Sequence, residues 1–294
     1  MTKDELELAA QSSYAYWKAS LEAVPSDEQR VNMAMREAKR YFVAASQNEA
    51  KALEFLRKTC TFRKSRRVDI LRACFDKDHT FADNTERDLA AQFRERILQD
   101  TANQEVVVLG RDTEGCAVLR LGERTCVKMD DEAFLTTQLY MVERALATTE
   151  ANTEGSQDSM VVLLDATCFK SKCAPSRSTL KELVSILQNH YPQRLKRLVV
   201  LNAPVWLRSA YAVLSPFLDK RTRRKFQVAN GAQAKRRTFE ELNGTEDAGA
   251  SDQVDMRLFL ARVPFQCGFE CSEKAEEIPL SFHGKESTQF VIVQ

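Results

Sequence analysis

Two polar residues stand at positions where α/β enzymes often keep catalytic groups. Asp165 closes the apolar run Met160-Val-Val-Leu-Leu, which is typical of a strand buried on both faces of a parallel sheet. His190 ends a predicted helix, where an imidazole can interact with the last helical carbonyls. No nucleophile or histidine is spaced beside Asp165 in a known catalytic pattern, so a loop-capping role is favoured for this carboxylate. We expect a protein that is not an enzyme, with an α/β hydrolase-like enzyme around Asp165 as a minor alternative.

The sequence also lacks the common motifs of catalytic, cofactor and metal sites. The sequence contains no Gly-x-Ser-x-Gly elbow, no Gly-rich phosphate loop ending in Lys-Ser/Thr and no His-Glu-x-x-His. Cys168-x4-Cys173 and Cys267-x3-Cys271 have poor zinc spacing, and none of the 3 histidines is placed to complete a site with them. We therefore expect no cofactor and no metal, and we interpret the 8 cysteines as free thiols in a reducing compartment.

The most informative stretch runs from Tyr191 to Lys225, because its central helix has few polar positions. Composition alone favours a buried core helix, and the alternative is a helix that meets an apolar ligand or a membrane. Basic residues lie on both sides of this helix within the stretch: Arg194, Lys196, Arg197, Lys220, Arg221, Arg223 and Arg224. The net charge of +1 argues against a nucleic-acid partner, whereas a local basic face can meet an anionic membrane. A solvated surface is the plainer interpretation of each single run.

Helices must precede this stretch. Apolar residues recur at helical spacing from Leu6 to Tyr14, from Ser26 or Asp27 towards Phe42, and from about Asn48 to Thr59. No glycine occurs before Gly110. We expect residues 1–100 to form an α-helical module. The acidic N-terminus and the absence of an apolar run near 20 residues predict a cytoplasmic protein.

Strands follow from residue 105. Residues 105–121 predict a β-hairpin, residues 131–148 a helix, and residues 149–159 a polar, mobile loop. Thr179 and Glu182 resemble a capping box that begins the helix towards Tyr191. The strands at 160–165 and 198–201 with that helix between them make a βαβ unit. Residues 226–228 are a further candidate strand, and 229–253 a flexible insertion.

Four short motifs in order resemble the CRAL-TRIO domain of phosphatidylinositol, tocopherol and retinaldehyde transfer proteins. They are Tyr191-Pro192-Gln193-Arg194, Asn202-Ala203-Pro204, Pro216-Phe217-Leu218-Asp219 and Thr222-x-x-Lys225. Weaker matches extend the resemblance to about residues 38–284, through Arg40-Tyr41-Phe42, Asp112-x-x-Gly115 and Ile278-Pro-Leu-Ser-Phe-His-Gly284. The resemblance implies an α/β lipid-binding fold, with a mostly parallel sheet as floor, flanking helices and an N-terminal helical module from about residue 38. The lipid-binding domain would span 101–294.

The resemblance also implies a site. A mobile helix would close over the ligand through Val205, Trp206, Leu207, Ala210, Tyr211, Leu214, Phe217 and Leu218. The lipid headgroup would meet Thr222, Lys225, Gln193 and Arg194, and the remaining basic residues (Lys196, Arg197, Lys220, Arg221, Arg223, Arg224) would dock on membranes. Two positions depart from the phosphoinositide-binding members, which carry a glutamate at Gln193 and a headgroup arginine at Val43. These departures put phosphatidylinositol in doubt as the ligand.

We therefore expect a carrier of one phospholipid or other lipophilic molecule that associates reversibly with anionic membranes. It would transfer that molecule between membranes or present it to other proteins. The alternative is a non-transferring scaffold or interaction module with a degenerate lipid site, which Gln193 and Val43 favour. The sequence leaves the lipid, the target membrane and the oligomeric state open.

Overall fold

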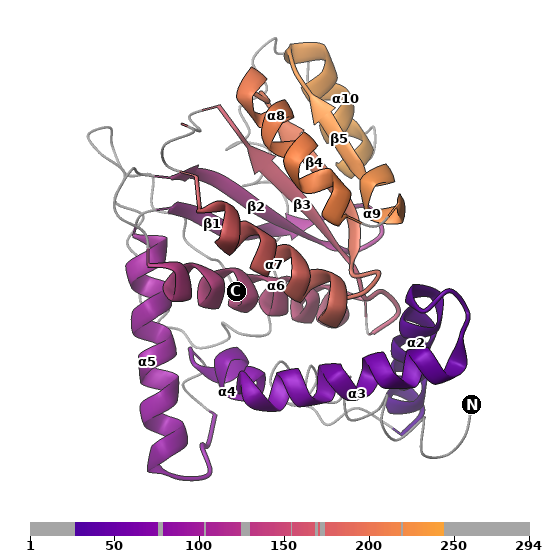
Figure 1. The fold of residues 1–294 in the computed structure, drawn as a ribbon, viewed down its shortest axis with the longest axis vertical. Coiled ribbons are helices and arrows are strands. Elements are labelled where there is room, and N and C mark those ends of the chain that lie inside the picture. Colours follow the sequence, from indigo (N-terminus) through magenta and orange to yellow (C-terminus); the bar gives the residue numbers. More distant parts are fainter. Residues whose placement is uncertain are drawn as a thin grey trace.

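The computed structural model describes residues 27–243, apart from 76–78, 103, 125–129, 154, 168–169, 171–173 and 219. The predicted helix at Leu6–Tyr14 and the motif at 278–284 lie outside these residues. A five-stranded sheet in the order β1-β2-β3-β4-β5 forms the centre of the fold (Figure 1). β1 (Gln104–Arg111) and β2 (Ala117–Arg124) pair antiparallel, and this pairing confirms the predicted hairpin. β2, β3 (Met160–Asp165), β4 (Leu195–Leu201) and β5 (Phe226–Ala229) run parallel.

Helices precede the sheet, as the sequence predicts for this part of the chain. They are α2 (Asp27–Ala44), α3 (Glu49–Ser65), α4 (Val68–Ala73) and α5 (Asn84–Thr101). Asn48 is the N-cap of α3, since its side chain accepts a hydrogen bond from the Lys51 amide. α2 and α3 pack on each other through Tyr41, Ala45, Ala52 and Leu56, all buried.

The two faces of the sheet have separate cores. On one face, α4, α5 and α6 (Asp131–Asn152) pack on Val106, Leu119 and Val162. On the other face, Phe239 and Leu242 of α10 (Ala232–Asn243) cover Val161 and Leu163. The alternation of side chains along a strand explains this division, since residues 161 and 162 point to opposite faces.

Two segments that were predicted as loops from the sequence are helical in the structure. Residues 149–152 are the last turn of α6, where Thr149 and Glu150 are buried, so the interpretation of 149–159 as a mobile loop was wrong at its start. Residues 232–243 are α10, so the flexible insertion predicted at 229–253 was wrong for this part. Its charged composition hid an amphipathic helix with Phe239 and Leu242 on the buried face. Residues 244–253 lie outside the described part.

Two crossovers place helices on the sheet face shared with α6. α7 (Arg177–His190) connects β3 to β4, and α8 (Val205–Leu214), the 3-10 turn η2 (Ser215–Phe217) and α9 (Lys220–Arg224) connect β4 to β5. Figure 1 shows α7 and α8 in front of the sheet and α10 behind it. α7 begins before the predicted capping box, because Ser176 is the N-cap and accepts from the Thr179 amide.

Candidate functional site

An incompletely covered apolar surface lies on the sheet face that α7 and α8 flank. Leu198 of β4 pairs with Phe226 of β5, and both remain half-buried. Val228, two residues further along β5, is 45% exposed. Because side chains two apart in a strand share a face, Val228 and Phe226 point to the same side. Leu164 of β3 is half-buried and lies on the same face, two residues after Val162. We call Leu164, Leu198, Phe226 and Val228 the apolar platform.

α7 borders the platform with an apolar face that is nowhere fully covered. Ile186 and Leu187 pack on the core together with Leu195 and Leu198 of β4. Yet five apolar residues of the helix are only half-buried: Leu180, Leu183, Val184, Ile186 and Leu187. Thr179 is the buried residue of this helix. An amphipathic helix with its apolar face left half-open indicates a surface that can accept further apolar contact.

α8 lies over the β5 side of the platform. The ring of Tyr211 stacks on Phe226 with 4.4 Å between the centroids. Trp206, Leu207 and Leu218 are half-buried, and Val205 is 82% exposed. Among the α8 side chains that the structure describes, none is buried, which favours a helix that meets an apolar ligand or a membrane over a buried core helix. The side chains of Ala210, Leu214 and Phe217 lie outside the description.

Three of the four candidate headgroup residues gather at the amino-terminal ends of β4 and β5. The Lys225 ammonium donates to the Leu195 carbonyl, and the Lys225 amide donates to the Thr222 carbonyl at 3.1 Å. Gln193 precedes Leu195 by two residues and has a φ of 61°, a left-handed conformation that L side chains rarely adopt. Lys225, Thr222 and Gln193 are all half-buried.

The fourth candidate, Arg194, is engaged elsewhere. It is 2% exposed, and its Nη2 donates to Glu37 of α2 at 2.8 Å. Its Nη1 donates to the Asp158 carbonyl at 2.8 Å and lies 3.5 Å from Glu150 of α6. The structure therefore places this guanidinium in a buried ion-pair network rather than beside Lys225.

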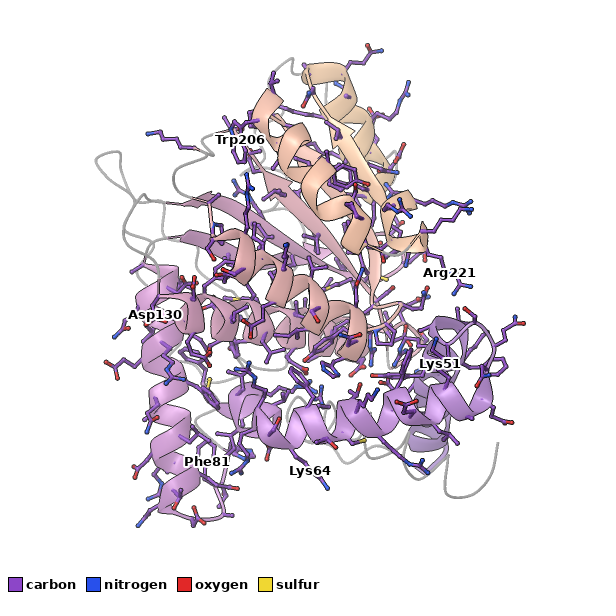
Figure 2. All side chains as sticks on the ribbon, viewed as in Figure 1. Lys51, Lys64, Phe81, Asp130, Trp206 and Arg221 are labelled. Atoms are coloured by element: carbon purple, nitrogen blue, oxygen red, sulfur yellow. The ribbon has the colours of Figure 1, made fainter. Side chains whose placement is uncertain are left out.

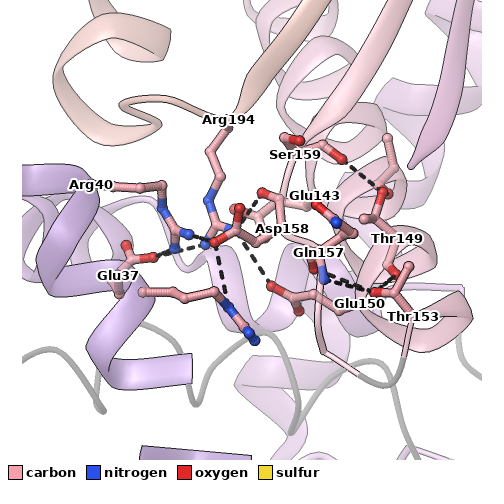
Figure 3. A network of polar contacts seen from close by, with 12 residues as sticks. Glu37, Arg40, Glu143, Thr149, Glu150, Thr153, Gln157, Asp158, Ser159 and Arg194 are labelled. Carbon is pink, nitrogen blue, oxygen red and sulfur yellow. Dashed lines mark hydrogen bonds and ion pairs between the residues drawn. The ribbon is translucent and has the colours of Figure 1, made fainter. Parts of the chain in front are cut away.

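That network joins the amino-terminal helices to the sheet (Figure 3). Arg40 of α2 pairs with Glu37 and with Asp158, and Arg36 lies 3.7 Å from the Asp158 carboxylate. Burial raises the pKa of Glu150, although Arg194, Arg72 and Arg40 oppose this effect. Charges in a low-dielectric interior are stable only when they are paired, so these contacts fix how α2 lies against β4 and α6.

A second buried carboxylate, Glu143 of α6, binds the other amino-terminal helices. It accepts from Arg63 of α3 at 2.7 Å and from the Tyr191 hydroxyl, and it lies 3.6 Å from Arg72 of α4. Burial alone raises the pKa of Glu143, but Arg63 and Arg72 outweigh it and the pKa is lowered. The sequence analysis missed Glu143 and Glu150. Their signal is two acids seven residues apart in a helix that also carries the apolar run Leu139 to Val142 and the apolar residues Ala145 to Ala147.

Comparison with known proteins identifies the domain that these elements form. Residues 102–244 match the model of the CRAL/TRIO domain family. The chain contains a CRAL/TRIO domain. The match covers β1 to α10, so it confirms the predicted family for the sheet and its flanking helices. The predicted relation of residues 38–101 and 245–284 to the same family stays a prediction.

Relatives share this domain within longer chains. The CRAL-TRIO domain-containing protein T23G5.2 of Caenorhabditis elegans is 32% identical over 88 residues, which are 30% of this chain and 12% of that protein. The phosphatidylinositol transfer protein PDR17 of Saccharomyces cerevisiae is 25% identical over 193 residues, 63% of this chain and 49% of the yeast protein. The crystal structure of Sfh5 superposes with a TM-score of 0.48 at 18% identity, covering 68% of each chain. The chain thus spans half or less of the two curated relatives.

The candidate docking cations of the CRAL/TRIO domain fall into two groups. Lys196 lies 2.6 Å from Asp112 and 3.0 Å from Glu114, and Arg197 lies 2.8 Å from Glu241. These two cations are partly neutralised by their acidic partners. The second group is on α9, where the four cations are exposed: Lys220, Arg221, Arg223 and Arg224.

The two candidate catalytic residues hold structural contacts in the CRAL/TRIO domain. Asp165 accepts from Arg120 at 3.3 Å and from the Thr167 hydroxyl at 2.6 Å, as expected for a loop-capping aspartate. His190 stacks on Phe62 with 4.0 Å between the ring centroids, and its Nδ1 lies 3.1 Å from the Thr59 hydroxyl. Burial and the nearby Arg63 lower the pKa of His190 to about 4.

Within residues 27–243 and outside their gaps, no group of three or more His, Cys, Asp or Glu side chains is placed to hold a metal ion. The helices in the same described part include none that is both long and apolar enough to cross a membrane.

Proposed function

We propose that the protein binds one lipid or lipophilic molecule on the apolar platform, beneath α8, and transfers it between membranes or presents it to other proteins. The observation that carries this proposal is the half-open apolar surface formed by the platform, α7 and α8. Apolar surface left on a folded domain costs free energy of about 25 cal/mol per Å², which a lipid tail would recover. The name of the yeast relative, a phosphatidylinositol transfer protein, supports the same class of ligand.

In this proposal α8 is a lid. A lipid that lies under the helix cannot enter or leave while Tyr211 rests on Phe226, so α8 has to move. When it moves, Trp206 and Leu207 meet the bilayer while α9 meets anionic headgroups. The protein would then work in the cytoplasm and associate with membranes reversibly. Asp165 and His190 support a function without catalysis, because both are occupied by structural contacts.

A matched pair of variants on β5 tests the proposal. Val228 and Gln227 are adjacent and both exposed, but they point to opposite faces of the sheet. Val228→Trp should fill the space above the platform and reduce the lipid that copurifies, whereas Gln227→Trp should leave it unchanged. Native mass spectrometry of the purified proteins, followed by organic extraction, measures bound lipid per chain.

Two outcomes would count against the proposal. If the wild-type protein copurifies without lipid and takes none from vesicles, the non-transferring scaffold becomes the better function, as Gln193 and Val43 suggest. If Val228→Trp and Gln227→Trp reduce bound lipid equally, the ligand does not lie on the platform.

A further inference from the structure

The last turn of α2 contacts both of the segments that flank the apolar platform. The Tyr41 hydroxyl donates to the carbonyl of His190, the last residue of α7, at 3.1 Å. Two residues later in α2, the Val43 carbonyl accepts a hydrogen bond from Nη1 of Arg221 at 2.9 Å. Arg221, labelled in Figure 2, lies in α9, which follows α8 and η2 after two further residues. Figure 1 shows α2 beside the end of α7 and below α9.

These two contacts differ in how easily they can be broken. Tyr41 is 0% exposed, and its hydroxyl also lies 2.8 Å from the Thr59 hydroxyl. The buried network at Glu37 and Arg40 holds the same face of this helix, one turn earlier. Arg221, in contrast, is an exposed side chain on a five-residue helix that has no buried residue. The contact of Tyr41 with α7 is therefore held by buried groups, whereas another hydrogen-bond acceptor can replace the Val43 carbonyl as the partner of Arg221.

Helix electrostatics explain why Arg221 binds where it does. The last carbonyls of a helix have no partner within the helix and carry partial negative charge. The last turn of α2 contains no basic residue of its own. Arg221 therefore supplies, from a distance of 178 residues in sequence, the cation that this helix end lacks.

A phosphate group is a stronger partner for Arg221 than a carbonyl. Charge-assisted bonds between guanidinium and phosphate are shorter and stronger than bonds to a neutral acceptor, and two can form in parallel. Lys220, Arg223 and Arg224 on the same short helix draw it towards an anionic surface. At such a surface, lipid phosphates can replace the Val43 carbonyl as the partner of Arg221.

We propose that Arg221 is a latch that couples docking on an anionic lipid surface to movement of α8. While Arg221 binds Val43, α9 is held to α2 and α8 stays over the platform. When headgroup phosphates bind Arg221 in place of the Val43 carbonyl, α9 moves away from α2, and the carboxyl-terminal end of α8 is released. The fixed contact at Tyr41 keeps α7 in place meanwhile. This inference rests on the proposed lipid-carrier function.

The first test needs no lipid. Arg221→Gln removes the latch, and Arg223→Gln removes the same charge from an equally exposed position of α9. Amide hydrogen exchange of residues 205–217 should be about two- to tenfold faster in Arg221→Gln, which is the effect expected for loss of one hydrogen bond. Arg223→Gln should exchange as the wild type does. Equal exchange in all three proteins would overturn the latch, whether or not the protein carries lipid.

The second test separates the latch from general attraction to membranes. With neutral phosphatidylcholine vesicles, Arg221→Gln should take up fluorescent lipid faster than the wild type, because its α8 is already released. With phosphatidylserine vesicles the advantage should vanish, since the surface releases the wild type as well. A simple docking role predicts slower uptake on anionic vesicles for Arg221→Gln and Arg223→Gln alike and no gain on neutral ones, and that result would refute the latch.

Two controls show whether a lipid surface or a free anion releases Arg221, and whether the contact with Val43 acts independently of lipid transfer. Inorganic phosphate added to neutral vesicles should leave the wild type slow, because it lacks the surface that gathers the other α9 cations. If phosphate alone accelerates uptake as much as phosphatidylserine does, a free anion rather than a lipid surface is the trigger. If no protein takes up lipid but Arg221→Gln still exchanges faster, the proposed function fails while the contact with Val43 retains its role in holding α9.

Discussion

Arg194 at the start of β4 and Glu37 in α2 are 157 residues apart in the sequence, yet Nη2 of the arginine lies 2.8 Å from the glutamate carboxylate. Both residues are at most 3% exposed. The pair attaches the amino-terminal helices to the CRAL/TRIO domain at the strand that supplies part of the apolar platform. It also sets the position of α2, whose last turn reaches both α7 and α9.

Removing one partner from this pair should lower the stability of the folded protein strongly. Glu37→Gln leaves Arg194 and Arg40 buried without one of their carboxylates, and we expect the free energy of unfolding to fall by about 3–5 kcal/mol. The matched control is Glu54→Gln, which breaks the solvent-exposed pair with Lys58 and should leave the free energy of unfolding almost unchanged. Urea denaturation of the three proteins measures both effects. Equal small losses would mean that the network does not attach α2.

The two buried acids of α6 should respond to pH in opposite directions. The lowered pKa of Glu143 gives stability that is present above about pH 4 and is lost as pH falls through the folded-state pKa. The raised pKa of Glu150 gives stability that is complete below about pH 4 and is lost as pH rises through the folded-state pKa. The advantage of the wild type over Glu143→Gln should therefore shrink as the pH falls below about 4, whereas its advantage over Glu150→Gln should shrink as the pH rises above about 4. Parallel curves for the two variants would contradict this assignment.

His190 should stay neutral at any pH near 7. Its pKa of about 4 results from burial and from Arg63, so the folded protein resists protonation that the unfolded chain accepts near pH 6.5. Stability is then present above pH 6.5 and falls as the pH drops towards about 4. Imidazole NMR should give a midpoint near 4 for this residue, and His190→Gln should flatten the stability curve between those values. A midpoint near 6.5 would mean that the contacts with Phe62 and Thr59 do not form.

Docking on anionic membranes should depend on α9 and much less on β4. The double variant Arg223→Gln/Arg224→Gln should weaken binding to phosphatidylserine vesicles about 30-fold, since each cation contributes about 1 kcal/mol near the surface. Arg197→Gln should have little effect, because Glu241 already pairs with this arginine. Flotation at rising salt should weaken wild-type binding steeply, as screening beyond about 8 Å implies. Salt-independent flotation would show that apolar contact alone causes docking.

The sequence predicted the sheet well because each strand depends on local information. Val106 to Leu109, Met160 to Leu164 and Leu198 to Leu201 are apolar runs bounded by polar residues, and the structure contains strands at all three places. The short strand at Phe226 was also found. α10 was missed because charged residues dominate its sequence, and only Phe239 and Leu242 reveal the side that packs on the sheet.

The contacts between distant segments could not be predicted in this way. Gln193, Thr222 and Lys225 were grouped by a family pattern, and the structure places them at neighbouring strand ends. Arg194 belonged to the same pattern, but its partner Glu37 is far away in sequence and no local feature links the two. Arg221 was predicted only as one of several docking cations, because its contact with Val43 involves a backbone carbonyl that any residue could provide.

The last prediction concerns the choice of headgroup. Lys225 is half-buried at the start of β5, and a phosphate could replace the Leu195 carbonyl as its acceptor through a stronger, charge-assisted bond. Gln193 and Val43 provide fewer charged partners for an inositol ring than a glutamate and an arginine would, and Arg40 and Arg194 are held in the buried network. The site should therefore prefer a phospholipid with a plainer headgroup, or a sterol- or tocopherol-like molecule whose single hydroxyl needs one partner.

A competition assay tests this preference. The protein is loaded with fluorescent phosphatidylcholine and titrated with phosphatidylinositol, and the titration is repeated with Lys225→Ala and with Lys220→Ala as the exposed control. We expect weak displacement by phosphatidylinositol and a loss of phosphatidylcholine affinity of about tenfold in Lys225→Ala only, since one charge-assisted hydrogen bond contributes about 1.5 kcal/mol. Strong displacement that disappears in Lys225→Ala would refute the weakened inositol site while supporting the role of Lys225. If Lys225→Ala changes the affinity for neither phospholipid, Lys225 does not bind the headgroup and a neutral lipophile becomes the better ligand.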